Sequence, residues 1–155
     1  MAMNNPRTAR APSNIKIWQQ NARKSARNTN YILNTTDPSK YDIILIQEPW
    51  FDHLGKTQGT HNWRIVYPPT IYHDDHDPIR SIILINTNIS TNMYTTLDIP
   101  CSDIMAVRLK GDFGYCSIFN IIMIVQITTP LQLYRTIYQH TAQRHSHRPQ
   151  IICCG

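Results

Sequence analysis

The chain has 155 residues, the size of a single domain. Lys and Arg outnumber Asp and Glu by 15 to 10, and the resulting net charge of +5 favours polyanionic partners such as nucleic acids. No stretch approaches the roughly 18 apolar residues of a transmembrane helix, and residues 1–13 lack the apolar core of a secretory signal. We therefore predict a nuclear or cytoplasmic protein that is not secreted and has no membrane partner; its oligomeric state stays open.

The polar N-terminus is followed by a predicted strand. Residues 1–13 carry Arg7 and Arg10 and are predicted to form a disordered basic arm. In residues 14–21, Ile15 and Ile17 alternate with Lys16 and Trp18, and this alternation predicts a strand with Ile15 and Ile17 on one face.

A helix and a buried strand are predicted next. Residues 22–36 indicate a loop and then a helix, with Ser25 as a candidate N-cap. Residues 42–47 hold the unbroken apolar run Ile43–Ile46 and stop before Pro49, which suits a strand buried on both faces better than a short buried helix.

The rest of the chain is rich in predicted strands. A turn is expected at 110–114, and a second helix is expected to begin at Thr129 with Pro130 in its first turn. Because strands outnumber helices, we predict β-rich layers covered by helices and not a doubly wound parallel sheet. The further predicted strands are 63–67, 80–86, 94–99, 104–109, 115–125 and 150–154.

The cysteines have no metal-binding or redox spacing. None of the four forms a Cys-x-x-Cys pair, and we interpret them as small, reduced core residues. They are Cys101, Cys116, Cys153 and Cys154.

Polar residues end the first two predicted strands. Asn21 closes the first strand, and Glu48 follows the second. If the two strands are neighbours, an amide and a carboxylate meet at one sheet edge, which is a usual place for chemistry in layered proteins. Alternatively, Glu48 simply points to water. Mg²⁺ takes oxygen ligands and polarises phosphoryl groups, so this pair suits phosphodiester hydrolysis.

In this order and spacing, the motifs resemble the endonuclease/exonuclease/phosphatase superfamily. The likeness is greatest to the endonuclease domain of fungal LINE-type (non-LTR) retrotransposons, and it runs from about Ile15 to Gly155. The motifs that carry it are Trp18-Gln19-Gln20-Asn21, Tyr41-Asp42-Ile43-Ile44-Leu45-Ile46-Gln47-Glu48-Pro49, Trp63-Arg64-Ile65-Val66-Tyr67-Pro68, Arg80-Ser81-Ile82-Ile83-Leu84-Ile85-Asn86, Leu109-Lys110-Gly111-Asp112-Phe113-Gly114 and Ile118-Phe119-Asn120-Ile121.

The resemblance implies a fold, an activity and two site residues. It implies an α/β (α+β) layered sandwich of two packed β-sheets flanked by helices, formed here by residues 14–155 and incomplete at the C-terminus. It also implies Mg²⁺-dependent nicking of DNA, with no small-molecule cofactor. Glu48 matches the family's metal-binding Glu, and Asn21 matches its active-site Asn.

The chain departs from the family pattern at two places. Ile122 and Met123 stand where the family has an active-site Tyr and a neighbouring Asn. Gly155 matches the Gly of the family's Gly-Asp-Phe-Asn motif, so the Asp and Asn of that motif and the later Ser-Asp-His segment are absent from this sequence. We therefore expect a truncated domain with weak activity or none.

Several other residues have two interpretations. Arg23, Lys24 and Arg27 either contact DNA phosphates or form a solvated helix start. Trp50 is a candidate for stacking on a base, whereas Trp63 is expected in the core.

Three other polar features are interpreted as structural. Arg80 is read as a plain strand-start residue, with a role in the site as the alternative. The cluster His73–Asp77 is interpreted as a hydrated acidic loop, with loose binding of a divalent ion as the alternative. Residues His145–His147 are interpreted as a basic surface loop, with a phosphate contact as the alternative.

Two functional hypotheses follow. The first is the Mg²⁺-dependent endonuclease domain of a retrotransposon-derived protein, acting on DNA phosphodiesters. The second is a non-enzymatic nucleic-acid-binding relic that uses its basic residues. A lipid or inositol phosphoesterase is disfavoured by the retrotransposon-like motifs.

Overall fold

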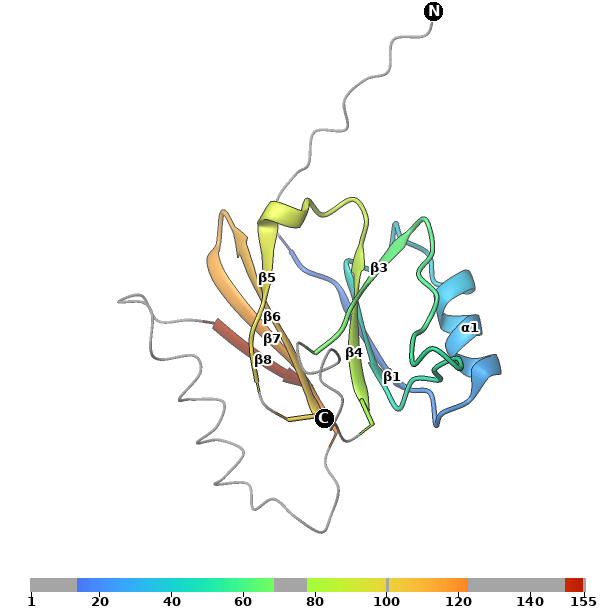
Figure 1. Ribbon diagram of the computed structural model, residues 1–155. Coiled ribbons are helices and arrows are strands. Elements are labelled where there is room, and N and C mark those ends of the chain that lie inside the picture. The colour runs from blue at the N-terminus through green and yellow to red at the C-terminus, as the bar shows by residue number, and fades with distance from the viewer. Residues whose placement is uncertain (1–13, 69–77, 100, 123–149, 155) are drawn as a thin grey trace, which may run out of the picture.

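The computed structural model describes residues 14–68, 78–99, 101–122 and 150–154. Two four-stranded β-sheets face one another, and helix α1 (Ala26–Thr35) lies on the outer side of the first sheet (Figure 1). The predicted α+β sandwich is therefore confirmed, with α1 as the flanking helix in the described part of the chain. The predicted basic arm, the helix at Thr129 and the two histidine-containing loops lie outside the described residues.

The first sheet has the strand order β1-β2-β4-β3. β1 and β2 are parallel because α1 connects them, while β4 is antiparallel to both β2 and β3. Their bounds are β1 (Ile17–Asn21), β2 (Ile43–Gln47), β3 (Trp63–Val66) and β4 (Ser81–Asn86).

The second sheet has the strand order β5-β6-β7-β8. β5, β6 and β7 run antiparallel, and β8 returns parallel to β7. A single 3₁₀ turn, η2 (Thr91–Met93), leads into β5. The strand bounds are β5 (Tyr94–Thr96), β6 (Ile104–Gly111), β7 (Gly114–Ile121) and β8 (Gln150–Cys154).

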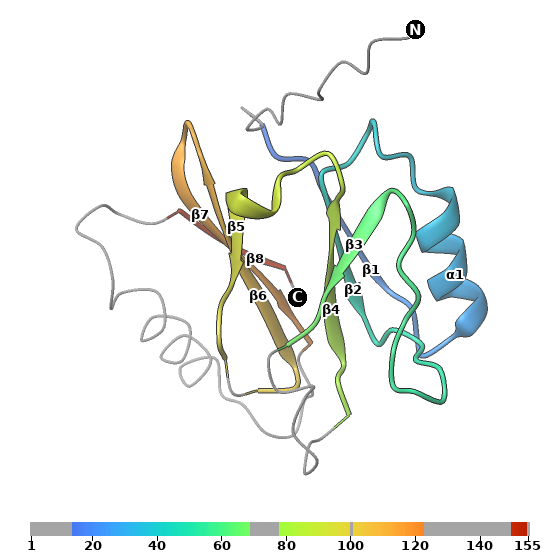
Figure 2. The ribbon, with the colours of Figure 1, turned by 45° about the horizontal axis from the view of Figure 1, so that its top comes forward.

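Alternation along β2 explains why both of its faces are apolar. Ile43 and Leu45 face the second sheet and join the cluster between the sheets, whereas Ile44 and Ile46 pack on the α1 side with Ile32. The turned view shows the same arrangement, with α1 outside the first sheet and the second sheet on the opposite side (Figure 2). β2 is thus a central strand, as its unbroken apolar run predicted.

α1 begins where the sequence predicted. Ser25 is the N-cap, and its Oγ accepts a hydrogen bond of 3.3 Å from the backbone N–H of Asn28. Ile32 and Leu33 form the buried side of the helix, whereas Tyr31, also expected there, is 62% exposed.

The β6–β7 hairpin is tighter than predicted. The turn was expected at 110–114, but β6 extends to Gly111 and β7 begins at Gly114, which leaves a two-residue loop. A Cβ at Gly111 would lie 2.5 Å from Cε1 of Phe113, so only glycine lets that ring fold back over the strand. The β5 strand is also shorter than predicted and ends at Thr96.

The cysteine interpretation is supported where side chains are described. Cys116 is buried between the sheets, and burial raises the pKa of its thiol. Cys101 is half-buried, and both of these cysteines are free thiols.

Candidate active site

The carboxyl ends of β1 and β2 meet at one edge of the first sheet. Asn21 is the register partner of Gln47, and Glu48 follows directly, so the expected meeting of amide and carboxylate takes place. The Asn21 side chain is exposed, and its Oδ1 accepts a hydrogen bond of 2.8 Å from the backbone N–H of Arg23. The amide hydrogens of Asn21 are therefore the part of the side chain that remains for a ligand.

Glu48 has an unusual backbone that is held on both sides. Its φ is +46°, a value that a residue with a side chain rarely adopts. Its N–H donates to the carbonyl of Arg80 at 2.8 Å, and its carbonyl accepts from the N–H of Lys24 at 2.7 Å. The carboxylate is half-buried and has no hydrogen bond or ion pair with the described residues.

A tight turn links Asn21 to α1 beside Glu48. Arg23 and Lys24 both have φ of +54°, and the N–H of Ser25 donates to the carbonyl of Ala22 at 3.0 Å. These features match a type I′ turn, which normally holds Asn or Gly because both central residues need positive φ. Three strained residues thus lie together at this edge, and such strain concentrates at functional sites.

The turn presents two cations to solvent next to Asn21. The side chains of Arg23 and Lys24 are exposed, as is that of Arg27 in the first turn of α1. Their positive charges create a local field that attracts an anion to the edge where Glu48 lies.

Two buried side-chain amides join the two sheets near this edge. Asn120 is completely buried, and its Nδ2 donates to the carbonyls of Ile46 and Ile82 at 2.9 Å each. Gln47 donates from Nε2 to the carbonyl of Ile121 at 2.5 Å. These bonds run between the two sheets, so they fix the Glu48 edge relative to the end of β7.

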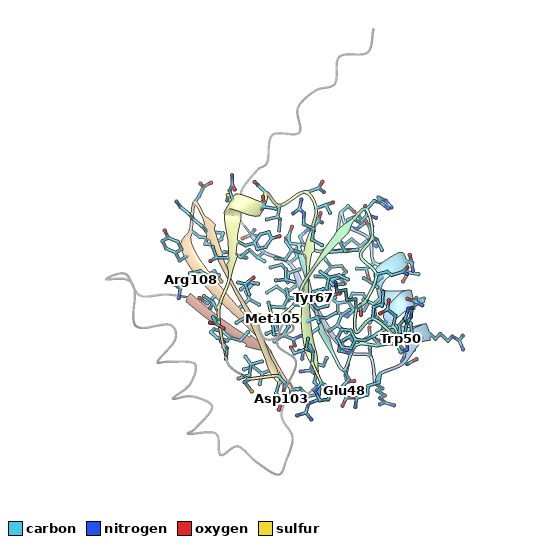
Figure 3. The ribbon with its side chains drawn as sticks, viewed as in Figure 1. Glu48, Trp50, Tyr67, Asp103, Met105 and Arg108 are labelled. Atoms are coloured by element: carbon cyan, nitrogen blue, oxygen red, sulfur yellow. The ribbon has the colours of Figure 1, made fainter. Side chains whose placement is uncertain are left out.

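An ion pair also joins the two sheets at this end. The Nε of Arg80 lies 2.7 Å from Oδ1 of Asp103, and both side chains are 25% exposed. Glu48 and Asp103 lie at the same end of the molecule, Glu48 on the first sheet and Asp103 on the second (Figure 3). Sequence reasoning considered Arg80 but missed Asp103, because no motif marks a lone Asp before a strand as the partner of an Arg 23 positions earlier.

The structure separates the two tryptophan predictions. Trp63 is 1% exposed and lies in the core, as predicted. Trp50 is half-buried, and its backbone is anchored by Thr29 Oγ1, which accepts from its N–H at 3.0 Å, and by Thr57 Oγ1, which donates to its carbonyl at 2.6 Å. Its backbone is thus tied to α1, and its stacking role stays a prediction.

The side chains at this edge could supply only a few ligands to a metal ion. Among the described residues, no group of three or more His, Cys, Asp or Glu side chains could enclose a metal ion. At this edge Asp103 is paired with Arg80, whereas the Glu48 carboxylate has no ion-pair partner in the described part of the chain. A single carboxylate fits Mg²⁺, which often keeps several waters and takes one or two carboxylates plus phosphate oxygens.

A comparison with solved structures shows what this architecture is similar to. The fold is shared with a retrotransposon endonuclease domain, so the resemblance seen in the sequence is confirmed at the level of the fold. One solved structure with this fold is the endonuclease domain of TRAS1, a telomere-specific non-LTR retrotransposon, with a TM-score of 0.59 and 16% sequence identity. The match covers 88% of this chain and 58% of that one, so this chain corresponds to less than two thirds of the TRAS1 domain.

Other comparisons found no match. No protein-family model matches the sequence, and no curated protein matches it significantly. Within the part of the chain that the structure describes, no helix is long and apolar enough to cross a membrane.

Proposed function

We propose that residues 14–155 are the N-terminal portion of a Mg²⁺-dependent endonuclease domain from a retrotransposon-derived protein, and that DNA phosphodiesters are its substrate. The observation that carries this proposal is the juxtaposition of Asn21 and Glu48 at the ends of adjacent parallel strands. The likeness to the TRAS1 endonuclease domain supports it, because that fold is shared over 88% of this chain.

Each residue at the edge has a role in this proposal. Glu48 holds the metal ion, because its carboxylate has no partner among the described residues. Bound Mg²⁺ would supply polarisation of the phosphodiester. Asn21 donates its amide hydrogens to a phosphate oxygen, since its Oδ1 already accepts a hydrogen bond from the backbone N–H of Arg23.

The basic side chains bring DNA to the edge. Arg23 and Lys24 are exposed beside Asn21 and neutralise phosphates, which contributes affinity but no sequence specificity. Trp50 is assigned to stacking on a base near the same edge.

We expect the hydrolytic activity of this chain to be weak. Ile122 and Met123 stand where the resemblance implies a Tyr and an Asn, so a hydroxyl and an amide that would contact the reacting phosphate are missing. Removing one preorganised donor of this kind typically costs about 10²–10³ in rate. This expectation also supports the second candidate, a non-enzymatic DNA-binding relic.

The experiment is nicking of supercoiled plasmid by the purified chain in Mg²⁺, beside an EDTA control. Glu48→Gln is the matched variant, because it keeps the shape of the side chain and removes its charge. Nicking that disappears with EDTA and with Glu48→Gln supports the endonuclease. Nicking that survives Glu48→Gln refutes the assignment of Glu48, and salt-sensitive DNA binding without nicking supports the relic.

A further inference from the structure

Arg80 lies at the proposed site through its backbone. The register of β2 and β4 pairs Gln47 with Ser81, and the hydrogen bond from the Glu48 N–H to the Arg80 carbonyl extends this pairing by one residue. Arg80, which directly precedes β4, is therefore bonded through its backbone to Glu48.

The side chain of Arg80 reaches the second sheet. Its Nε contacts Asp103, which directly precedes β6, and its backbone N–H donates to the carbonyl of Ser102 at 3.2 Å. The carbonyl of Asp103 accepts from the N–H of Ile122 at 3.0 Å. The ion pair thus spans the space between Glu48 at the end of β2 and Ile122 at the end of β7.

The ion pair uses only part of the guanidinium. Arg80 binds Asp103 through Nε, and its terminal amino groups have no hydrogen bond with the described residues. A guanidinium carries five N–H donors in a rigid planar fork, which suits bidentate binding of a phosphate. The contact with Asp103 therefore leaves Arg80 oriented and still able to bind an anion.

Stability alone does not explain this arrangement. The side chains are 25% exposed, but the paired atoms Nε and Oδ1 are themselves buried and make no hydrogen bond with the described residues. An ion pair of this kind adds little net stability, because the cost of desolvating the two charges offsets their attraction. An oriented cation has a larger effect on binding, because less side-chain freedom is lost when the ligand arrives. Glu48 is linked through its backbone to Arg80 on one side and to Lys24 on the other, and Arg23 belongs to the same exposed turn as Lys24.

We propose that Arg80 binds a DNA phosphate beside Glu48, and that Asp103 is the positioning residue that orients its guanidinium. This inference rests on the proposed function, because it assigns one more contact to the same site. Arg80 would then be a cation held in place between the two sheets, whereas Arg23 and Lys24 lie on an exposed turn.

The test is binding of a short double-stranded oligonucleotide by the full 155-residue chain, in EDTA and over a series of salt concentrations. Arg80→Gln should weaken binding about tenfold at low salt and lower the slope of log K against log[salt] by about one. Asp103→Asn removes the charge that pairs with Nε, so it should weaken binding at low salt but keep the wild-type salt slope, because Arg80 retains its own charge.

Arg64→Gln is the matched control. Arg64 is also half-buried and donates to the carbonyls of Ile89 and Thr87, but these lie beyond the other end of β4. Arg64→Gln should leave the salt slope unchanged, and thermal melting of every variant separates binding from folding.

The outcomes discriminate between the proposals. If Arg80→Gln keeps the wild-type slope, Arg80 contacts no phosphate and the inference is overturned. If Asp103→Asn binds DNA as tightly as the wild type, Asp103 does not orient Arg80 and that part of the inference is overturned. If the wild type itself does not bind DNA, the proposed function fails and this inference fails with it.

Discussion

The backbone N–H of Lys24 donates a hydrogen bond of 2.7 Å to the carbonyl of Glu48, and both residues have positive φ. A hydrogen bond therefore joins the strained turn after β1 to the strained residue after β2. Left-handed backbone costs a residue with a side chain about 1–2 kcal/mol, so the fold sacrifices stability here. Arg23 adds a third strained residue at the same edge.

Lys24→Gly should relieve part of this strain. Glycine adopts positive φ without a steric penalty, although its greater freedom in the unfolded chain offsets some of the gain. We expect the free energy of unfolding to rise by about 0.5–1 kcal/mol in urea denaturation. Lys40→Gly is the control, because Lys40 is exposed and is not among the residues with positive φ. The strain argument is wrong if both variants are destabilised equally.

Asn120→Ala should be strongly destabilising. The substitution removes two hydrogen bonds between the sheets and leaves a cavity at a completely buried position. The combined loss is about 2–4 kcal/mol. Ser117→Ala is the matched control on the same strand, since Ser117 is also buried and its side chain has one hydrogen bond with the described residues, which it accepts from Arg108 Nε at 3.2 Å. Equal losses in the two variants, measured by denaturant unfolding, would contradict a special role for Asn120.

The sequence revealed the strands better than it revealed the site. The apolar runs of β2 and β4 are continuous because both strands are buried on both faces, so they were readable directly. The meeting of Asn21 and Glu48 could also be anticipated, because it needs only that two successive strands be neighbours. The pairing of Arg80 with Asp103 depends on how two sheets pack, and no local periodicity records that.

Backbone conformation was equally invisible in the sequence. Turns of type I′ are recognised from Asn and Gly, and here their two central positions hold Arg23 and Lys24. Sequence reasoning therefore assigned these residues to a loop and found no turn. The cap at Ser25 was found because its residue type is the common one for that position.

Asp52 should make the loop that follows β2 sensitive to acid. The backbone N–H of Lys56 donates to its carboxylate at 3.0 Å and that of Leu54 at 2.9 Å, and these bonds, chiefly that from Lys56, lower the pKa of Asp52 below its ordinary value of 3.8. A lowered pKa means that the bonds stabilise the loop above the ordinary value, and that this contribution is lost as the pH falls through the folded-state pKa.

An NMR titration checks this prediction. The Asp52 carboxyl resonance should titrate below pH 3.8, and the amide signals of Leu54 and Lys56 should shift with the same midpoint. Asp52→Asn should abolish the linked shifts and speed hydrogen exchange at the Lys56 amide near neutral pH. A carboxyl midpoint at or above the ordinary value would contradict the hydrogen bonds seen here.

The position of the cations, and not their number, should determine DNA binding. Arg23 lies beside Asn21 at the proposed site, whereas Lys110 is equally exposed near the β6–β7 turn, at the opposite end of β6 from Asp103. Arg23→Gln and Lys110→Gln remove the same charge, so a binding mode that depends only on net charge predicts equal effects. We expect Arg23→Gln to lower the salt slope of oligonucleotide binding by about one and Lys110→Gln to leave it unchanged, because only displaced counterions at contacted phosphates contribute to the slope. Filter binding across a salt series measures both slopes, and equal slopes for the two variants would show that DNA does not dock at the Asn21 edge.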